Sequence, residues 1–152
     1  MNILAALLIV FFSAILIIPF LKTTWKGAFA AVTVGLIAIL SSLLSVKSLY
    51  GINFETILPG SLISGEIPIR IDRLSAWFIL IINFTCLTGV IYGTGYLKNN
   101  CESNAKLSFH WIWLIIFHFS MILVCTIQNT LVFLIIWEIM SLSSMMLVIF
   151  DH

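Results

Sequence analysis

The chain has 152 residues, of which 62% are hydrophobic and only 9% are charged, and its net charge is +1. Because soluble domains carry about 25% charged residues, this composition predicts an integral membrane protein of the all-α class. The near-neutral charge does not favour a nucleic-acid partner or an acidic substrate. The three cysteines lie far apart without metal-ligand spacing, so we predict neither a metal nor another cofactor.

Five apolar segments predict five transmembrane helices, because each approaches the roughly 20 residues that cross a bilayer. They cover residues 3–21, 27–46, 74–97, 109–127 and 130–150. No basic residue precedes the first segment, and its apolar stretch is longer than that of a usual secretory signal, so we expect a retained helix. The lipid bilayer is therefore an expected partner of the chain.

Lysines in the short loops predict the orientation, since cytoplasmic loops carry an excess of Lys and Arg. The first loop holds Lys22 and Lys26, and the third holds Lys98 and Lys106. The longer second loop, residues 47–73, has as many acidic as basic residues. We therefore expect a multi-pass protein of the cell (inner) membrane, with its N-terminus outside and its C-terminus in the cytoplasm.

The second loop, which this orientation places outside, is expected to carry a short strand. Apolar and polar residues alternate over 67–72, after a turn signal at 64–65, which is typical of one strand of a hairpin. Pro68 favours an edge strand, because it has no N–H to donate to a ladder. Asp72 or Ser75 is expected to cap the third helix.

Small residues predict where the helices pack, because they let backbones approach closely in lipid. Gly89 and Gly93 form such a pair on the third segment. On the second segment, small residues at spacings of three and four share one helical face: Ala28, Ala31, Gly35, Ala38, Ser42 and Ser45. Asn83, Thr85 and Thr88 on the third segment are expected to bond across helices or to their own backbone.

Glu138 is the most informative residue, because it lies two positions from the centre of the apolar segment 130–150. Its backbone is then about 3 Å from the bilayer midplane, where an acid costs roughly 2.5 kcal/mol or more. We expect Glu138 to carry protons or cations; the alternative is a structural acid, neutral or paired inside a bundle. The polar face around it predicts that it points into protein or water: Thr130, Leu134, Ser141 and Ser144.

His118 is the second ionisable residue at depth, at the centre of the fourth segment. It lies about ten residues before the short connection 128–129, and Glu138 lies about ten after it, so an antiparallel hairpin puts both at one depth. We therefore treat His118 as a candidate relay residue beside Glu138. Equal depth does not determine helix rotation, and the alternative is that His118 binds a neighbouring helix.

Two sequence stretches carry a family resemblance. FLIIWEIMSLSSMMLVIF resembles the fifth-helix signature of the antiporter-like membrane subunits of respiratory complex I, multi-subunit cation/proton antiporters and group 4 hydrogenases. IPIRIDRLSAWFILIINFTCLTGVIYGTGYL resembles their outer strand and third helix. The WEIMSLSS wording is most similar to the large membrane subunit of hydrogenase-4 and formate hydrogenlyase.

The resemblance implies a partial version of a fold with about fourteen helices and two inverted repeats. Residues 1–73 would hold helices 1 and 2 with the outer loop, 74–108 helix 3 and a cytoplasmic loop, and 109–152 helices 4 and 5, which begin the first repeat. Glu138 occupies the place of the family's essential glutamate, which pairs with a lysine on a later helix. No Lys or Arg lies inside a predicted span here, so we expect a missing partner segment that carries an intramembrane lysine.

The expected function is proton or cation translocation by a subunit fragment that belongs to a redox-driven ion pump, complex I-like or hydrogenase-like. Its partners would be other membrane subunits, and no redox site is expected on this chain. The sequence stops directly after the fifth segment, so we expect a truncated product, a fragment or half of a split system. The alternatives are a non-transporting or degenerate scaffold and, third, a small channel formed by oligomerisation.

Overall fold

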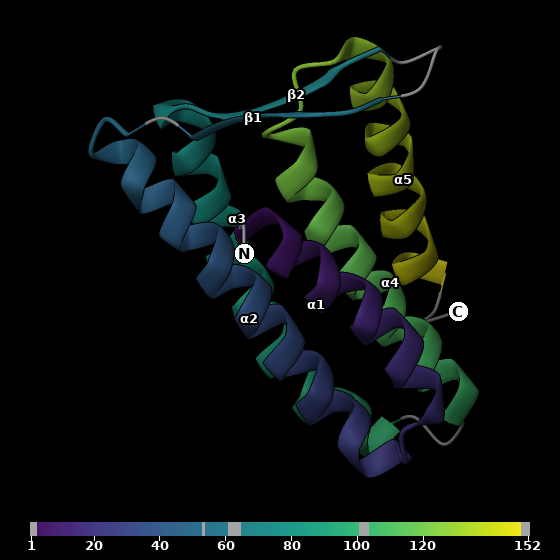
Figure 1. Ribbon diagram of the computed structural model, residues 1–152. Helices are drawn as coiled ribbons and strands as arrows, with labels where there is room; N and C mark the ends of the chain where they lie inside the picture. Colours follow the sequence, from purple (N-terminus) through teal and green to yellow (C-terminus); the bar gives the residue numbers. More distant parts are fainter. Residues whose placement is uncertain (1–2, 53, 61–64, 101–103, 150–152) are drawn as a thin grey trace.

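The computed structural model describes residues 3–52, 54–60, 65–100 and 104–149. Within these ranges it contains five long apolar helices and a two-stranded hairpin (Figure 1). The helices are α1 (Ile3–Ile17), continued by the 3-10 turn η1 (Ile18–Phe20), α2 (Thr23–Leu49), α3 (Arg73–Asn100), α4 (Asn104–Val124) and α5 (Thr130–Ile149). Each has the length and hydropathy of a membrane span, which confirms the predicted helical membrane protein. Its inside–outside orientation stays a prediction.

Several helices extend beyond the predicted spans. α2 begins at Thr23, so Lys26 lies in its first turn and not in a loop. α4 begins at Asn104, so Lys106 also lies in a first turn. The prediction that no lysine lies inside a span is therefore wrong at the helix ends. A long cationic side chain is tolerated at a helix end when its ammonium group reaches the interface or a hydrogen-bond partner.

Local backbone chemistry ends the first two helices. Pro19 in η1 has no N–H for a helical hydrogen bond, so α1 does not continue. At the end of α2, Gly51 adopts a positive φ of 92°. The Gly51 N–H donates to the Ser48 carbonyl at 3.0 Å, and the Ile52 N–H donates to the Lys47 carbonyl at 3.1 Å. This is the glycine-dependent Schellman pattern, which satisfies the last carbonyls of a helix.

The second loop forms an antiparallel hairpin between β1 (Phe54–Leu58) and β2 (Ile67–Ile71). The predicted strand is thus confirmed, whereas its partner β1 was not predicted. Arg70 Nε lies 3.3 Å from Glu55 Oε1 across the two strands, but both side chains are exposed, so this ion pair contributes little stability. The predicted turn residue at 64 and the chain end at 150–152 lie outside the described residues.

β2 also binds the connection between α4 and α5. It is an edge strand of the two-stranded sheet, as Pro68 predicts, and its outer edge is used here. The Arg70 N–H donates to the Thr126 carbonyl at 2.9 Å, and the Gln128 N–H donates to the Pro68 carbonyl at 3.0 Å. The hairpin therefore lies across the ends of α4 and α5, at one end of the bundle (Figure 1). We call this the hairpin end.

The core lies between α1, α2, α3 and α4, where α2 packs most extensively on α3. The rings of Phe11 and Phe119 stack with centroids 4.2 Å apart and join α1 to α4. Fully buried apolar side chains come from η1, α2, α3 and α4, including Ile18, Val34, Ile37, Ile79, Val90 and Ile115.

The small residues were predicted only partly correctly. Ala38 and Ser45 are buried, but Gly35 faces open space and Ala28 is exposed. On α3, a Cβ at Gly93 would lie 3.4 Å from the Trp111 ring, whereas a Cβ at Gly89 would meet nothing within 4 Å. Close packing therefore uses the later part of the α2 stripe, and its earlier part borders a pocket.

Asp72 caps α3, as one of the two predicted alternatives. Its Oδ1 accepts the Ser75 N–H at 2.8 Å, and this bond holds the pKa of the Asp72 carboxyl below its ordinary value of 3.8. A lowered pKa in the folded state means that the ionised cap adds stability at neutral pH, and that this stability is lost as the pH falls through the folded-state pKa.

We expect Asp72→Ala to lower the free energy of unfolding by about 1 kcal/mol at neutral pH. The loss should shrink well below pH 3.8, as the pH falls through the lowered folded-state pKa, because Asp72 then takes up a proton and its cap weakens. Unfolding of the chain in detergent micelles at both pH values measures it. Asp72→Asn is the control, because it keeps a cap oxygen without a titrating charge. An equal loss for Asp72→Ala at both pH values would contradict the ionised cap.

Candidate functional site

Glu138 lies on an exposed face of α5. This helix stands beside α4 at the edge of the bundle (Figure 1), and Ser143 is its one buried residue within the described part of the chain. The other polar-face residues predicted from the sequence are exposed or half-buried: Thr130, Leu134, Ser141 and Ser144. The face that carries Glu138 therefore points away from α1 to α4.

This exposure matters because α5 is a membrane span. A carboxylate in contact with lipid near the bilayer centre costs roughly 2.5 kcal/mol or more. Exposed apolar side chains flank it on the same helix, including Leu134 and Trp137, which are 49% and 47% exposed. A face with these properties is suited to contact with further protein that surrounds the acid.

Asn129 positions the start of this helix. Its Oδ1 accepts the N–H groups of Leu131 at 3.1 Å and Val132 at 3.2 Å, so it is the N-cap of α5. Its Nδ2 donates to the Glu66 carbonyl at 3.1 Å, beside β2. One side chain thus joins the hairpin to the helix that carries Glu138. Sequence analysis missed this role, although an Asn directly before an apolar helical segment is a known start signal.

His118 belongs to a buried polar cluster that joins three helices. Its exposed fraction is 0%, and its Nε2 lies 3.0 Å from Asn83 Oδ1 on α3. The Asn83 Nδ2 group in turn shares its two hydrogens among three acceptors on α2, which are Ser41 Oγ and Ser42 Oγ, both at 2.8 Å, and the Ala38 carbonyl at 3.2 Å. Buried polar groups require such partners, because an unmade hydrogen bond in an apolar interior is costly.

The geometry of this cluster determines which imidazole nitrogen carries the proton. A carbonyl oxygen only accepts, so the Asn83 atom beside the Ala38 carbonyl is the amide nitrogen. Asn83 Oδ1 therefore faces His118, and Nε2 must donate to it. In the neutral ring Nδ1 is then the acceptor, and this buried atom has no partner within the described residues. His118 therefore offers one proton-accepting atom inside the bundle, at Nδ1.

The structure places His118 and Glu138 in different surroundings. Within the described part of the chain, no hydrogen bond or ion pair joins the side chains of His118 and Glu138. His118 instead hydrogen-bonds Asn83 on the neighbouring helix α3, which agrees with the alternative interpretation of this residue. Asn83 bonds across helices, whereas Thr85 and Thr88 donate to carbonyls of their own helix. A joint relay of His118 and Glu138 stays a prediction.

Lys26 is buried at the opposite end of the bundle from the hairpin. Its exposed fraction is 1%, and its Nζ donates to the Asn104 carbonyl at 3.0 Å and contacts Ser108 Oγ. The prediction that it lies in a loop is therefore wrong, because its ammonium group is bound by the first turns of α4. Lys26 fastens the start of α2 to the start of α4.

Across the described ranges, no three His, Cys, Asp or Glu side chains gather closely enough to hold a metal ion. The described cysteines, Cys86 and Cys125, are both half-buried and unlinked. The ionisable residues that remain at depth are His118 and Glu138.

Comparisons with known proteins relate the chain to antiporter subunits. No protein-family model matches it. It is 31% identical over 127 residues to the "Putative antiporter subunit mnhA2" of Staphylococcus saprophyticus, a match that covers 76% of this chain and 15% of the relative. Proteins of the same name from Staphylococcus epidermidis and Staphylococcus aureus are 33% and 34% identical over 83 residues, which is 55% of this chain and 10% of each relative.

The chain therefore spans 10 to 15% of the length of these curated relatives. It is a distant, partial homologue of an antiporter subunit, which confirms the broad family resemblance read from its sequence. The closer likeness to hydrogenase-4 is not found in these matches, all of which carry the antiporter name.

Proposed function

We propose that this chain is part of a cation/proton antiporter membrane subunit and that Glu138 is its proton carrier. The observation that carries this proposal is a carboxylate on the exposed face of a membrane span, in a partial homologue of an antiporter subunit. Ionisable groups at this depth mark proton and ion pathways more often than they serve as inert structure.

Reversible protonation of Glu138 would supply the chemistry. An ionised carboxylate attracts a cation or a cationic side chain, and a protonated one does not. Alternate occupation by a proton and by a neighbouring positive charge therefore couples the movement of one to the movement of the other. The chain provides the acid, and a segment that carries an intramembrane lysine would provide the positive charge.

His118 is proposed as a second proton site, distinct from the acid. Because Nε2–H is held by Asn83, a proton would enter and leave His118 through Nδ1. Asn83 does not titrate, so it would orient the ring without passing a proton on. Residues 109–152, which contain both ionisable side chains, are proposed to begin the first repeat of the longer fold.

The proposed partners are other membrane subunits of an antiporter assembly, as the names of the relatives indicate. A more specific form of the proposed function couples this assembly to a complex I-like or hydrogenase-like redox enzyme. That version is supported by the WEIMSLSS resemblance alone, so antiport without a redox partner is the primary proposal.

A scaffold role is the second candidate. It is favoured by the positions of the cations, because the described Lys and Arg residues lie in loops, the hairpin or terminal helix turns, and none pairs with Glu138. A scaffold would hold neighbouring subunits through the exposed face of α5 without any proton exchange at the acid.

Ion flux in membrane vesicles tests the proposal. Vesicles would be prepared from cells that lack other antiporters and that produce either the complete assembly or the assembly without this chain. Na⁺ or K⁺ would then be added while a dye reports the internal pH. We expect a cation-dependent pH change only when the chain is present. Transport that continues unchanged without the chain, in an assembly with all other subunits, would contradict the proposal. Responses to Na⁺ and to K⁺ identify the cation.

A further inference from the structure

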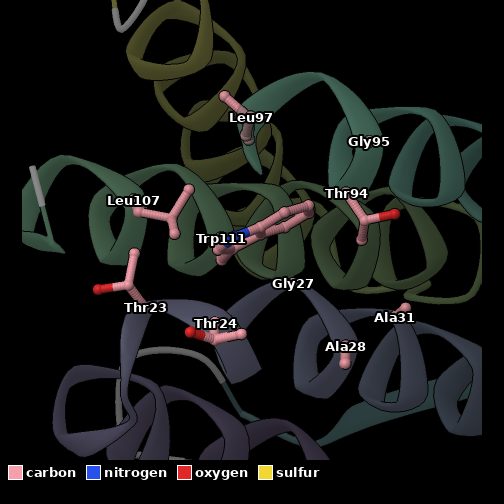
Figure 2. Close-up of a pocket in the computed structure, with 10 residues that line it drawn as sticks. All are labelled: Thr23, Thr24, Gly27, Ala28, Ala31, Thr94, Gly95, Leu97, Leu107 and Trp111. Carbon is pink, nitrogen blue, oxygen red and sulfur yellow. The ribbon is translucent and has the colours of Figure 1, made fainter. Parts of the chain in front are cut away.

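A pocket of about 590 Å³ opens between α2, α3 and α4 at the end of the bundle opposite the hairpin (Figure 2). Its wall consists of small, threonine and apolar residues: Thr23, Thr24, Gly27, Ala28, Ala31, Thr94, Gly95, Leu97, Leu107 and Trp111. Figure 2 shows the indole of Trp111 between the α2 residues on one side and the α3 residues on the other. The pocket takes no part in the proposed proton chemistry of Glu138 or His118.

The lining changes from polar to apolar along α2. Hydroxyl groups of Thr23 and Thr24 stand at the helix start, and Gly27, Ala28 and Ala31 follow on the next turns. At about 1.5 Å per residue, the change takes place over roughly 12 Å of helix. Because α2 is a membrane span, this direction runs from the interface into the hydrocarbon region.

The same end of the bundle is positively charged. Lys22 directly precedes Thr23, and Lys106 directly precedes Leu107, so both adjoin the pocket lining, and both are exposed. The acidic side chains in the described part of the chain lie elsewhere: Glu55, Glu66 and Asp72 belong to the hairpin end, and Glu138 to the middle of α5. No acid among the described residues therefore neutralises the two lysines; Glu102, in the connection between α3 and α4, lies outside the described residues.

We propose that this pocket binds an anionic phospholipid. The phosphate would lie near Lys22, Lys106 and the threonine hydroxyls, and one acyl chain would follow the small residues of α2 beside Trp111. Basic pockets between transmembrane helices are recognised sites for such headgroups. The Nε1–H of Trp111 has no acceptor among the described residues, and the glycerol esters of a lipid supply acceptors. Charge and polarity thus match an amphipathic anion.

The binding test compares two lipids that differ in headgroup charge. The full chain, purified in mild detergent, would be titrated with phosphatidylglycerol or phosphatidylcholine, and native mass spectrometry would count the lipids retained. We expect preferential retention of phosphatidylglycerol. Lys22→Gln combined with Lys106→Gln should weaken its binding about 30-fold, since each surface lysine contributes modestly to attraction of an anionic lipid. Lys47→Gln at the hairpin end is the matched charge control.

A second pair of variants tests the acyl-chain site. Ala31→Trp should fill the pocket and reduce retention, whereas Val32→Trp, on the neighbouring position that is 60% exposed, should not. Equal retention of the two lipids, or of phosphatidylglycerol by Ala31→Trp and Val32→Trp, would overturn the proposal. Retention by the isolated chain that disappears in the complete assembly would also overturn it, because a protein segment would then occupy the pocket.

Discussion

Glu138→Gln is expected to abolish cation-coupled proton transport by the complete assembly, while the chain itself stays folded. Glutamine has nearly the same shape but does not exchange a proton near neutral pH, so a carrier at this position stops. The structure gives a reason for intact folding, because the side chain is exposed and no described residue hydrogen-bonds to it. Flux in vesicles and unfolding of the purified chain measure the two effects separately.

Two neighbouring changes serve as controls for this result. Glu138→Asp keeps a titratable carboxyl one methylene shorter, so it should retain part of the transport. Ser141→Ala alters the same exposed face without removing an acid, and its transport should stay near that of the unchanged assembly. If Glu138→Gln transported as well as Ser141→Ala, the acid would not be the carrier, and the scaffold role would be favoured.

The largest expected effect on stability comes from Asn83→Leu. The change removes the acceptor of the His118 Nε2–H and the donor to Ser41 and Ser42. A buried donor without a partner costs about 1–3 kcal/mol, so the free energy of unfolding should fall by about that amount. Titration of the chain in mixed micelles with a denaturing detergent measures the loss, with helicity followed by circular dichroism.

A double substitution separates the pairing from simple loss of packing. Asn83→Leu with His118→Leu leaves no unpaired imidazole donor, so part of the lost stability should return. Thr85→Val is the matched control on α3, because its hydroxyl is exposed and donates only to carbonyls of its own helix. Its effect should stay within about 0.5 kcal/mol. Additive losses for the two leucine substitutions would contradict the Asn83–His118 bond.

Local patterns predicted the elements that depend on nearby residues. Hydropathy over about 20 residues identified every described membrane helix, because backbone groups in lipid must be satisfied within the helix. Alternation over 67–72 identified β2, and polar residues near the start of an apolar segment gave Asp72 as one of two candidate caps, beside Ser75. The position of Glu138 near the bilayer centre could also be predicted from local sequence. The energetic cost of a carboxylate in the membrane depends on where it lies within its own span.

Features that join distant segments were missed or misplaced. β1 is a five-residue strand, and a lone hairpin of this size is marginal without the bundle end beneath it. The burial of Lys26 depends on the start of α4, 78 residues away in the sequence. The local sequence around β1 or Lys26 does not indicate the distant segment that each one contacts. These contacts therefore depend on the tertiary structure.

Helix rotation is the clearest example, because a span that is apolar on all sides does not indicate which face meets the bundle. The sequence predicts His118 and Glu138 at one depth in the membrane. In the structure, His118 faces Asn83, whereas Glu138 lies on the outer face of α5. The order of residues thus specified that an acid stands in the membrane. The side of the helix on which Glu138 lies follows from how α5 packs against α4.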